Sequence, residues 1–352
     1  LSIGWSFISA IITVALFIPF SELFSLTIDF PLYYPAAYIL GNMLISFGNA
    51  FCYSKYRFVL PGMVAGAINL LLILLLTGAR HLHAEAYFIP VYFLSFLLHG
   101  SILFMLILIR FKKIPSFNFS RINLKSIFNY SLHAYAGNLL FLLMNRVDYL
   151  FVRKYCTPGD LGNYIQVSKA AQLFLILPSI ISTVLFPVIA GGLKHAVATR
   201  VRTLSVMIIF VYSLALLLLL ITGYWLFPFL YGGSFNKMYW PFVLLIPGIL
   251  ALSSLYPYNA YYSAIDKLMI NIRGSFFAVL VIVAGDALLI PVYGIRAAAL
   301  ISSAGYVVYH AYVVSVFKKE HLLSFKELFI LSRQEYLYIL KGLIHNPANY
   351  KE

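Results

Sequence analysis

Long apolar runs recur along the whole chain, and short polar stretches with basic residues separate them. A run of about 18 or more apolar residues is long enough to cross a bilayer as a helix. A helix is also required there, because in lipid only helices satisfy all their backbone hydrogen bonds within one segment. The pattern predicts ten spans, over residues 2–22, 32–53, 58–78, 87–109, 127–149, 162–189, 203–230, 238–260, 268–290 and 295–316.

The composition supports this interpretation. The 352 residues are 62% hydrophobic and 10% charged, whereas a soluble domain is about 45–50% apolar and about 25% charged. So little polar surface cannot cover a water-soluble body of this size. We therefore predict an all-α polytopic membrane protein with about ten transmembrane helices.

The formal net charge of +14 is carried mainly by loops. In a soluble protein it would suggest a nucleic-acid partner, but here the loops alternate in charge. Loops on one side, together with the C-terminal tail, hold 18 Lys and Arg residues, and the opposite loops hold six. Because cytoplasmic loops are enriched in Lys and Arg, we predict the plasma (inner) membrane, a cytoplasmic C-terminus and no nucleic-acid partner.

The basic stretch RFKKIPSFNFSRINLK, Arg110 to Lys125, separates four predicted spans from six. We therefore predict a partial N-terminal bundle over 1–110, a cytoplasmic linker over 111–126, a six-helix bundle over 127–317 and a tail over 318–352. The amphipathic tail is expected either to lie on the inner leaflet or to pack on the bundle as a terminal helix. Since Leu1 already lies inside an apolar segment, we expect that N-terminal residues are missing.

Polar side chains gather on one side of the span 127–149. At about 100° per residue, one sector holds Ser131, Asn138, Asn145, Arg146 and Asp148, and the opposite, lipid-like sector holds Leu132, Ala136, Leu139, Leu140, Leu143, Met144 and Val147. Ionisable residues within spans usually face a bundle interior or a water-filled cavity. Two interpretations are open for Arg146 and Asp148: they line such a cavity, or they lie at the outer end of the span near the headgroups, where Asp148 would make a hydrogen bond that pins the helix.

Three more ionisable residues lie within later spans. Lys169 is about two turns into its span, too deep for an ordinary loop residue, so we expect an interior cation. Asp286 is either a proton or cation site or a buried acceptor that pairs a neighbouring helix. His310 lies on a polar face of the last span, where a satisfied interior histidine is commoner than a proton relay.

Arg146, Lys169 and Arg296 together would make the outer half of a central cavity positive. Arg and Lys bind phosphate oxygens strongly where the dielectric constant is low. We therefore predict an anionic substrate such as a phosphate or diphosphate headgroup, with Asn138 and Asn145 beside the cations.

Motifs of catalysis and of cofactor binding are missing from the sequence. It has no Walker loop, no HExxH and no GxSxG. Cys52 and Cys156 lack metal-ligand spacing, and His81, His83 and Glu85 are best interpreted as an ordinary polar loop. We predict that the protein is not an enzyme and uses no cofactor and no metal.

The segment from Asn145 to Ala190 carries a family resemblance. Its features are Arg146-x-Asp148 at the end of one helix, an outer turn ending DLGNY at Tyr164, and the pairs Leu177-Pro178 and Phe186-Pro187 in the next helix. A weaker match is YGIRAAA, from Tyr293 to Ala299. In these features, and in its layout, the chain resembles polysaccharide (Wzx-like, O-antigen) flippases of the multidrug/oligosaccharidyl-lipid/polysaccharide exporter superfamily.

This resemblance implies two six-helix bundles around a central cavity. The first four spans would then correspond to the third to sixth, with two helices missing at the N-terminus. Lys169 departs from the family, where a small residue is commoner at that position. Because the first half would be incomplete, a non-transporting structural partner is one alternative.

The implied activity is the transfer of an undecaprenyl-diphosphate-linked oligosaccharide from the inner to the outer leaflet by alternating access. Asp286, Asp148 or His310 would couple this transport to an ion gradient, or transport would run downhill with synthesis. Expected partners are the lipid-linked substrate, membrane lipids, a polysaccharide polymerase and glycosyltransferases. The alternatives are cation-coupled multidrug efflux within the same superfamily and a membrane-embedded glycosyltransferase or polymerase.

Overall fold

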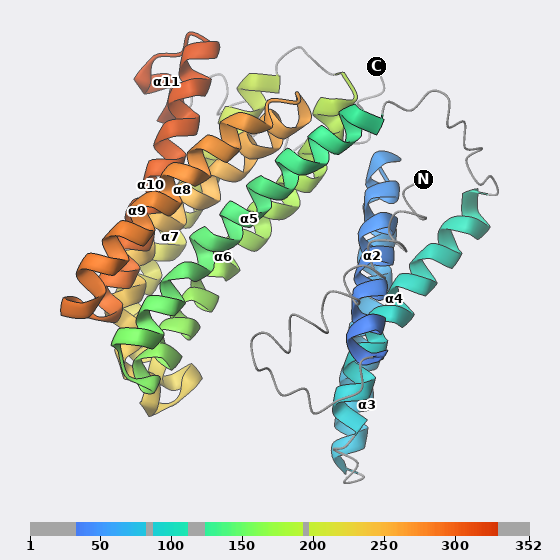
Figure 1. Ribbon diagram of the computed structural model, residues 1–352, viewed down its shortest axis with the longest axis horizontal. Helices are drawn as coiled ribbons and strands as arrows, with labels where there is room; N and C mark the ends of the chain where they lie inside the picture. Colours follow the sequence, from blue (N-terminus) through green and yellow to red (C-terminus); the bar gives the residue numbers. More distant parts are fainter. Residues whose placement is uncertain (1–32, 82–86, 112–123, 193–196, 330–352) are drawn as a thin grey trace. The chain divides into compact units, whose positions relative to one another are not determined.

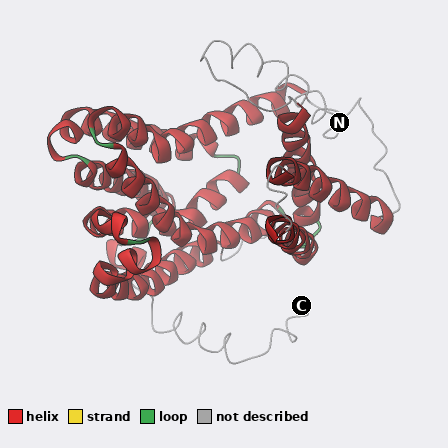
Figure 2. Ribbon diagram, turned by 90° about the horizontal axis from the view of Figure 1, so that it is seen from below, coloured by secondary structure: helices red, strands yellow, loops and turns green. Residues whose placement is uncertain are grey.

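The computed structural model describes residues 33–81, 87–111, 124–192 and 197–329, and this part of the chain contains α-helices, one 3₁₀ helix and no strand (Figures 1 and 2). The α-helices are α2 (Tyr33–Ser54), α3 (Val59–His81), α4 (Phe88–Phe111), α5 (Leu124–Tyr155), α6 (Pro158–Ala190), α7 (Val197–Tyr231), α8 (Tyr239–Ala264), α9 (Leu268–Tyr293), α10 (Ile295–Glu320) and α11 (Phe325–Phe329); the 3₁₀ helix is η3 (Gly233–Met238). The predicted all-α class is confirmed. The predicted span 2–22 lies outside the described residues, and each later span coincides with a helix.

Seven of the described helical segments are long and apolar enough to cross a membrane. Several helices are longer than their predicted spans. For example, α7 has 35 residues. At 1.5 Å per residue its length is about 52 Å, which exceeds the thickness of the hydrocarbon core of a bilayer, roughly 30 Å. Its extension corrects one expectation. Arg202, predicted in a loop, lies inside α7 and is 6% exposed. The chain is a multi-pass membrane protein.

Two compact units divide the chain, Leu1–Ile122 and Asn123–Glu352. In the first unit α4 packs on α2 and on α3. Glycine makes the α2–α4 approach close, because a Cβ on Gly100 would lie 2.7 Å from the Gly41 carbonyl oxygen. Small residues allow the same kind of close backbone approach in other membrane helix pairs.

In the second unit α8 is central and packs against α6, α7 and α10, while α9 packs against α5 and α10. Two hydrophobic clusters fill this unit, one around Tyr164 and Phe242 and the other around Tyr258 and Phe317. Met144, which was expected on the lipid-like side of its helix, is 0% exposed within the second cluster. The expectation was wrong because several helices cover α5, so that part of its apolar side is core.

The beginning of the tail packs on the second unit. Ser324 and Glu327 form reciprocal backbone-to-side-chain hydrogen bonds of 2.6 and 3.3 Å at the start of α11, and these bonds hold the pKa of the Glu327 carboxyl below its usual value. Leu328 is 4% exposed, and Arg202 Nη1 donates to the Glu327 carbonyl at 2.7 Å. Of the two interpretations of the tail, packing on the bundle holds for α11. The remainder of the tail, residues 330–352, lies outside the described residues.

Candidate functional site

The turn between α5 and α6 begins with a capping box. Thr157 is the N-cap residue and Pro158 follows it; the Asp160 backbone N–H donates to Thr157 Oγ1 at 3.2 Å, and the Thr157 backbone N–H donates to Asp160 Oδ2 at 3.4 Å. Thr157 Oγ1 also donates to Asp160 Oδ2 at 2.7 Å. These bonds satisfy backbone donors that the first turn of a helix leaves free.

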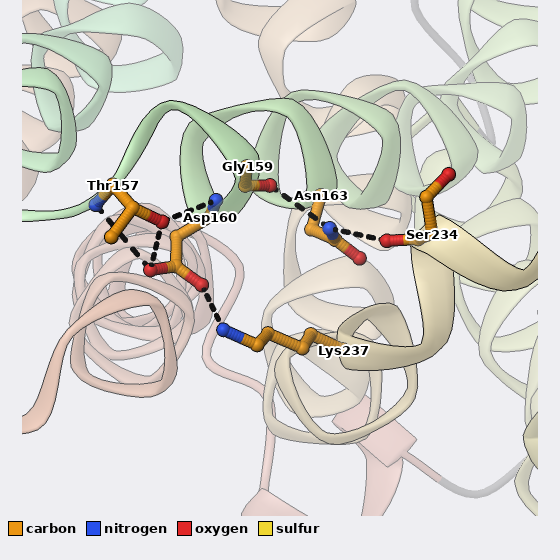
Figure 3. Close-up of polar contacts among 6 residues, drawn as sticks. All are labelled: Thr157, Gly159, Asp160, Asn163, Ser234 and Lys237. Carbon is orange, nitrogen blue, oxygen red and sulfur yellow. Dashed lines mark hydrogen bonds and ion pairs between the residues drawn. The ribbon is translucent and has the colours of Figure 1, made fainter.

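The same turn is tied to η3, which follows α7 (Figure 3). Lys237 Nζ lies 2.8 Å from Asp160 Oδ1. Asn163 Nδ2 donates to two carbonyls, Gly159 at 2.9 Å on its own helix and Ser234 at 3.1 Å on η3. The polar residues of the DLGNY motif therefore hold the start of α6 against η3.

Tyr164, the last residue of that motif, connects it to Arg146-x-Asp148. The Tyr164 hydroxyl donates to Asp148 Oδ2, and Ser302 Oγ on α10 donates to the same oxygen at 3.2 Å. Asp148 is 2% exposed. Asp148 is thus a buried acceptor that joins α5, α6 and α10, and it does not extend toward headgroups.

Arg146 is in a different environment from Asp148, as expected for residues two apart on a helix, which point about 200° from each other. Arg146 is exposed within its unit. Its Nη1 donates to the Tyr149 hydroxyl at 3.0 Å, and its guanidinium carbon lies 5.2 Å from the centroid of that ring. Tyr149 therefore orients the cation without neutralising its charge.

Arg146 lines an open cavity of about 410 Å³ between α5 and α6, which we call the arginine cavity. Its polar lining consists of Asn138, Asn145, Arg146, Gln172, Ser179 and Tyr256. The structure thus brings together three residues predicted as a substrate site, Asn138, Asn145 and Arg146. Gln172 and Ser179 were missed, although their spacing of seven places them on one face of α6.

A much smaller space lies beside it. A cavity of about 20 Å³, lined among others by Asn145, Tyr164 and Tyr306, has room for about one water molecule. The Tyr306 hydroxyl donates to Asn145 Oδ1 at 3.3 Å. Asn145 therefore borders both the arginine cavity and the interior polar groups of α6 and α10.

Two predicted cations are not part of the arginine cavity. Lys169 is exposed on α6 and Arg296 is exposed at the start of α10, and neither lines this cavity. Lys169 is exposed within the second unit, and its role as an interior cation stays a prediction. Depth along a span is visible in a sequence, whereas the side that neighbours cover is not.

Asp286 on α9 is 0% exposed, and both of its carboxylate oxygens lack a hydrogen-bond partner among the described residues. Within the described part of the chain it therefore has no partner on a neighbouring helix, in contrast to Asp148. His310 is half-buried on α10. The described residues contain no group of three His, Cys, Asp or Glu side chains that could hold a metal ion.

Replacement of the two buried carboxylates, Asp286 and Asp148, is expected to change the stability of the protein in opposite directions. Asp286→Leu is expected to raise the melting temperature, because it removes a buried carboxyl that no other residue of the described ranges hydrogen-bonds. Asp148→Leu is expected to lower the free energy of unfolding by about 1–3 kcal/mol, because it removes the acceptor of Tyr164 and Ser302. Thermal unfolding of both purified variants in one detergent checks this, and a shift in the same direction for both would contradict it.

Comparisons with known proteins agree with this architecture. Residues 91–239 match a family described as "Polysaccharide biosynthesis protein". The crystal structure of a mutant of the Vibrio cholerae MATE transporter VcmN is 13% identical and has a TM-score of 0.74, with 93% of this chain and 78% of that chain covered. The bent form of VcmN is 14% identical and has a TM-score of 0.70, with 96% and 78% covered. No curated protein matches significantly.

The predicted resemblance to polysaccharide exporters therefore agrees with the family match over residues 91–239 and with the fold that the chain shares with the VcmN structures. The fold is that of a MATE transporter, and the family match covers most of α4 in the first unit and α5, α6, α7 and η3 in the second. The family description names polysaccharide biosynthesis, and VcmN is described as a transporter.

Proposed function

We propose that this multi-pass membrane protein flips a lipid-linked oligosaccharide. Two findings support the proposal: part of the sequence matches a polysaccharide-biosynthesis family, and the fold is that of a MATE transporter. The substrate is an undecaprenyl-diphosphate-linked glycan, moved from the inner to the outer leaflet of the plasma membrane for surface polysaccharide biosynthesis. Its partners in this process are the glycosyltransferases that build the glycan and the polymerase that consumes it.

The observation that carries the proposal is the arginine cavity. It combines one oriented guanidinium, Arg146, with neutral amides and hydroxyls in a volume of about 410 Å³, within the usual range of ligand sites. A guanidinium binds phosphate oxygens through two parallel N–H groups. The polar lining suits the diphosphate, while the polyprenyl chain stays in lipid.

Transport by this fold requires that the cavity open alternately to the two sides of the membrane. In such transporters one bundle rocks against the other around the substrate. The prolines inside α6, Pro178 and Pro187, interrupt the backbone hydrogen bonds of a helix that lines the cavity. They supply points where that helix can bend.

Asp286 is the leading candidate for coupling to a proton or cation gradient, because it is a buried carboxyl with no hydrogen-bond partner among the described residues. Asp148 is the weaker candidate because its carboxylate already accepts hydrogen bonds from the hydroxyls of Tyr164 and Ser302. His310 is a third candidate. An Asp286→Leu protein that is more stable and yet does not export glycan would identify a residue kept for function at the expense of stability.

Multidrug efflux is the second candidate function, and the MATE fold favours it. The four predicted spans of the first unit argue against it, because their only acidic residue is Glu22, at the end of the span 2–22, and a cationic drug would need carboxylates to attract it. A glycosyltransferase or polymerase would need a large loop with catalytic residues. The described turns between α5 and α6 and between α9 and α10 are only a few residues long.

The test is deletion of the gene in a host that makes surface glycan. Lipid-linked repeat units are expected to accumulate on the cytoplasmic face, and surface glycan is expected to fall and to return with the wild-type gene. Unchanged surface glycan would overturn the proposal. Increased drug sensitivity with normal surface glycan would favour efflux.

A further inference from the structure

A second cavity, of about 290 Å³, lies along the first half of α5, where it meets α8, α9 and α10. We call it the amide pocket; its polar lining includes Tyr130, His133, Asn138, Asn259, Asn271 and Tyr309. Its volume is near the lower end of the range for small-molecule sites. The function proposed above, which invokes only the arginine cavity, leaves this pocket unexplained.

The pocket has no formal charge, since the described residues that line it include no Asp, Glu, Lys or Arg. An anionic ligand would find no cation in the lining and would be repelled by the Asp266 carboxylate, which acts on Tyr130, and a cationic ligand would find no carboxylate in the lining itself. An acyl or polyprenyl chain would bury amides without partners, which is costly. The lining therefore suits a neutral polar ligand.

Three side chains on one face of α5, those of Tyr130, His133 and Asn138, can form further hydrogen bonds. Asn138 and Tyr130 are exposed, and their side chains make no hydrogen bond with another described residue. His133 Nδ1 lies 2.7 Å from the Asn129 carbonyl oxygen; because a carbonyl only accepts, Nδ1 carries the proton and Nε2 is an acceptor in the neutral ring. The face thus offers both donors and acceptors.

The opposite wall is already ordered by its own hydrogen bonds. Asn271 Nδ2 donates to the Asn259 carbonyl at 3.1 Å and to Ser263 Oγ at 3.2 Å, and the Tyr309 hydroxyl donates to Asn259 Oδ1 at 3.3 Å. Such bonds hold these polar groups in position before a ligand arrives, which reduces the entropy lost on binding. The aromatic ring of Tyr309 adds an apolar surface.

Sugar hydroxyls match this environment because each both donates and accepts, and the apolar face of a sugar ring packs on aromatic side chains. Asn138 and Phe141 line both cavities, so the pockets are neighbours. From Asn138 to Arg146 the helix rises about 12 Å at 1.5 Å per residue. A ligand with its diphosphate at Arg146 would therefore carry its sugars toward the amide pocket.

We propose that the amide pocket binds a neutral sugar of the substrate, of the hexose or N-acetylhexosamine class, and excludes acidic sugars. This inference rests on the proposed flippase function and adds the class of sugar that the protein recognises. The amides pair with hydroxyl or acetamido groups, whereas the carboxylate of a uronic acid would lie among uncharged groups without a cation to compensate its desolvation.

The test uses the full protein in detergent and saturation-transfer NMR with three probes: the methyl glycosides of glucose, N-acetylglucosamine and glucuronic acid. The two neutral glycosides are expected to bind and the glucuronide is not. A Tyr130→Phe/His133→Phe double variant removes two hydrogen-bonding groups from exposed positions, and about tenfold weaker binding is expected. Asn138→Leu should weaken binding as well, while the matched exchange Asn42→Leu on α2 should leave it unchanged.

Equal binding of the glucuronide, or unchanged affinity in the double variant, would overturn the inference. Binding of inorganic pyrophosphate separates this result from a failure of the proposed function. If pyrophosphate binds and neutral glycosides do not, the amide pocket is not a sugar site and the flippase proposal stands. If surface glycan is also unchanged in the deletion strain, the flippase proposal itself has failed.

Discussion

Exchange of Arg146 for Gln is expected to weaken the binding of inorganic pyrophosphate by about 10- to 100-fold. A hydrogen bond to a charged group contributes about 1.5–3 kcal/mol, which corresponds to that range of affinity. Tyr149 already holds the guanidinium, through a bond of 3.0 Å and its ring face, so little ordering of the side chain is needed on binding. Calorimetric titration of the purified protein measures the effect.

Arg153→Gln is the matched control. Arg153 is also exposed and lies near the end of α5, but it does not line the arginine cavity. The control should bind pyrophosphate as the wild type does. In cells, Arg146→Gln should reduce surface glycan while the protein remains in the membrane. Equal affinity in the two variants would show that Arg146 is an interfacial anchor.

Gly41→Ala is expected to destabilise the first unit by about 3 kcal/mol, at the upper end of the usual cost of overpacking. A Cβ at this position would overlap the backbone of Phe96 and Leu97 on α4. Backbone atoms cannot rotate away as a side chain can, so α2 and α4 would have to separate. The melting temperature of the purified variant measures the loss.

Gly66→Ala on α3 is the comparison, because a Cβ there meets nothing within 4 Å. In an exposed helix interior this exchange is neutral or stabilises by up to about 1 kcal/mol through helix propensity. Similar melting temperatures for Gly41→Ala and Gly66→Ala would mean that the α2–α4 contact does not contribute to stability.

The arginine cavity was predictable in part. Asn138, Asn145 and Arg146 share one helix, so their common face follows from 3.6 residues per turn, and all three line the cavity. Lys169 and Arg296 lie on other helices and do not line it. For residues on different helices, sequence gives the depth in the membrane but not which sides face each other.

The family motifs also separate what the sequence predicts from what only the packing of the helices decides. Arg146-x-Asp148 and DLGNY are recognisable as short stretches of sequence, but their connection is the hydrogen bond from Tyr164 to Asp148, which joins two helices. Asp148 and Asp286 both appear as carboxylates within spans. Only their surroundings distinguish a carboxylate with three donors from one without any among the described residues.

By itself the sequence determined that the protein is helical, crosses the membrane repeatedly and resembles polysaccharide exporters, because span length, hydropathy and local motifs depend on neighbouring residues in the chain. The tertiary structure alone decided which polar residues share a cavity, which are buried acceptors and which are exposed. Those properties depend on how helices distant in sequence pack against each other, and small residues such as Gly41 and Gly100 set that packing through close backbone contact.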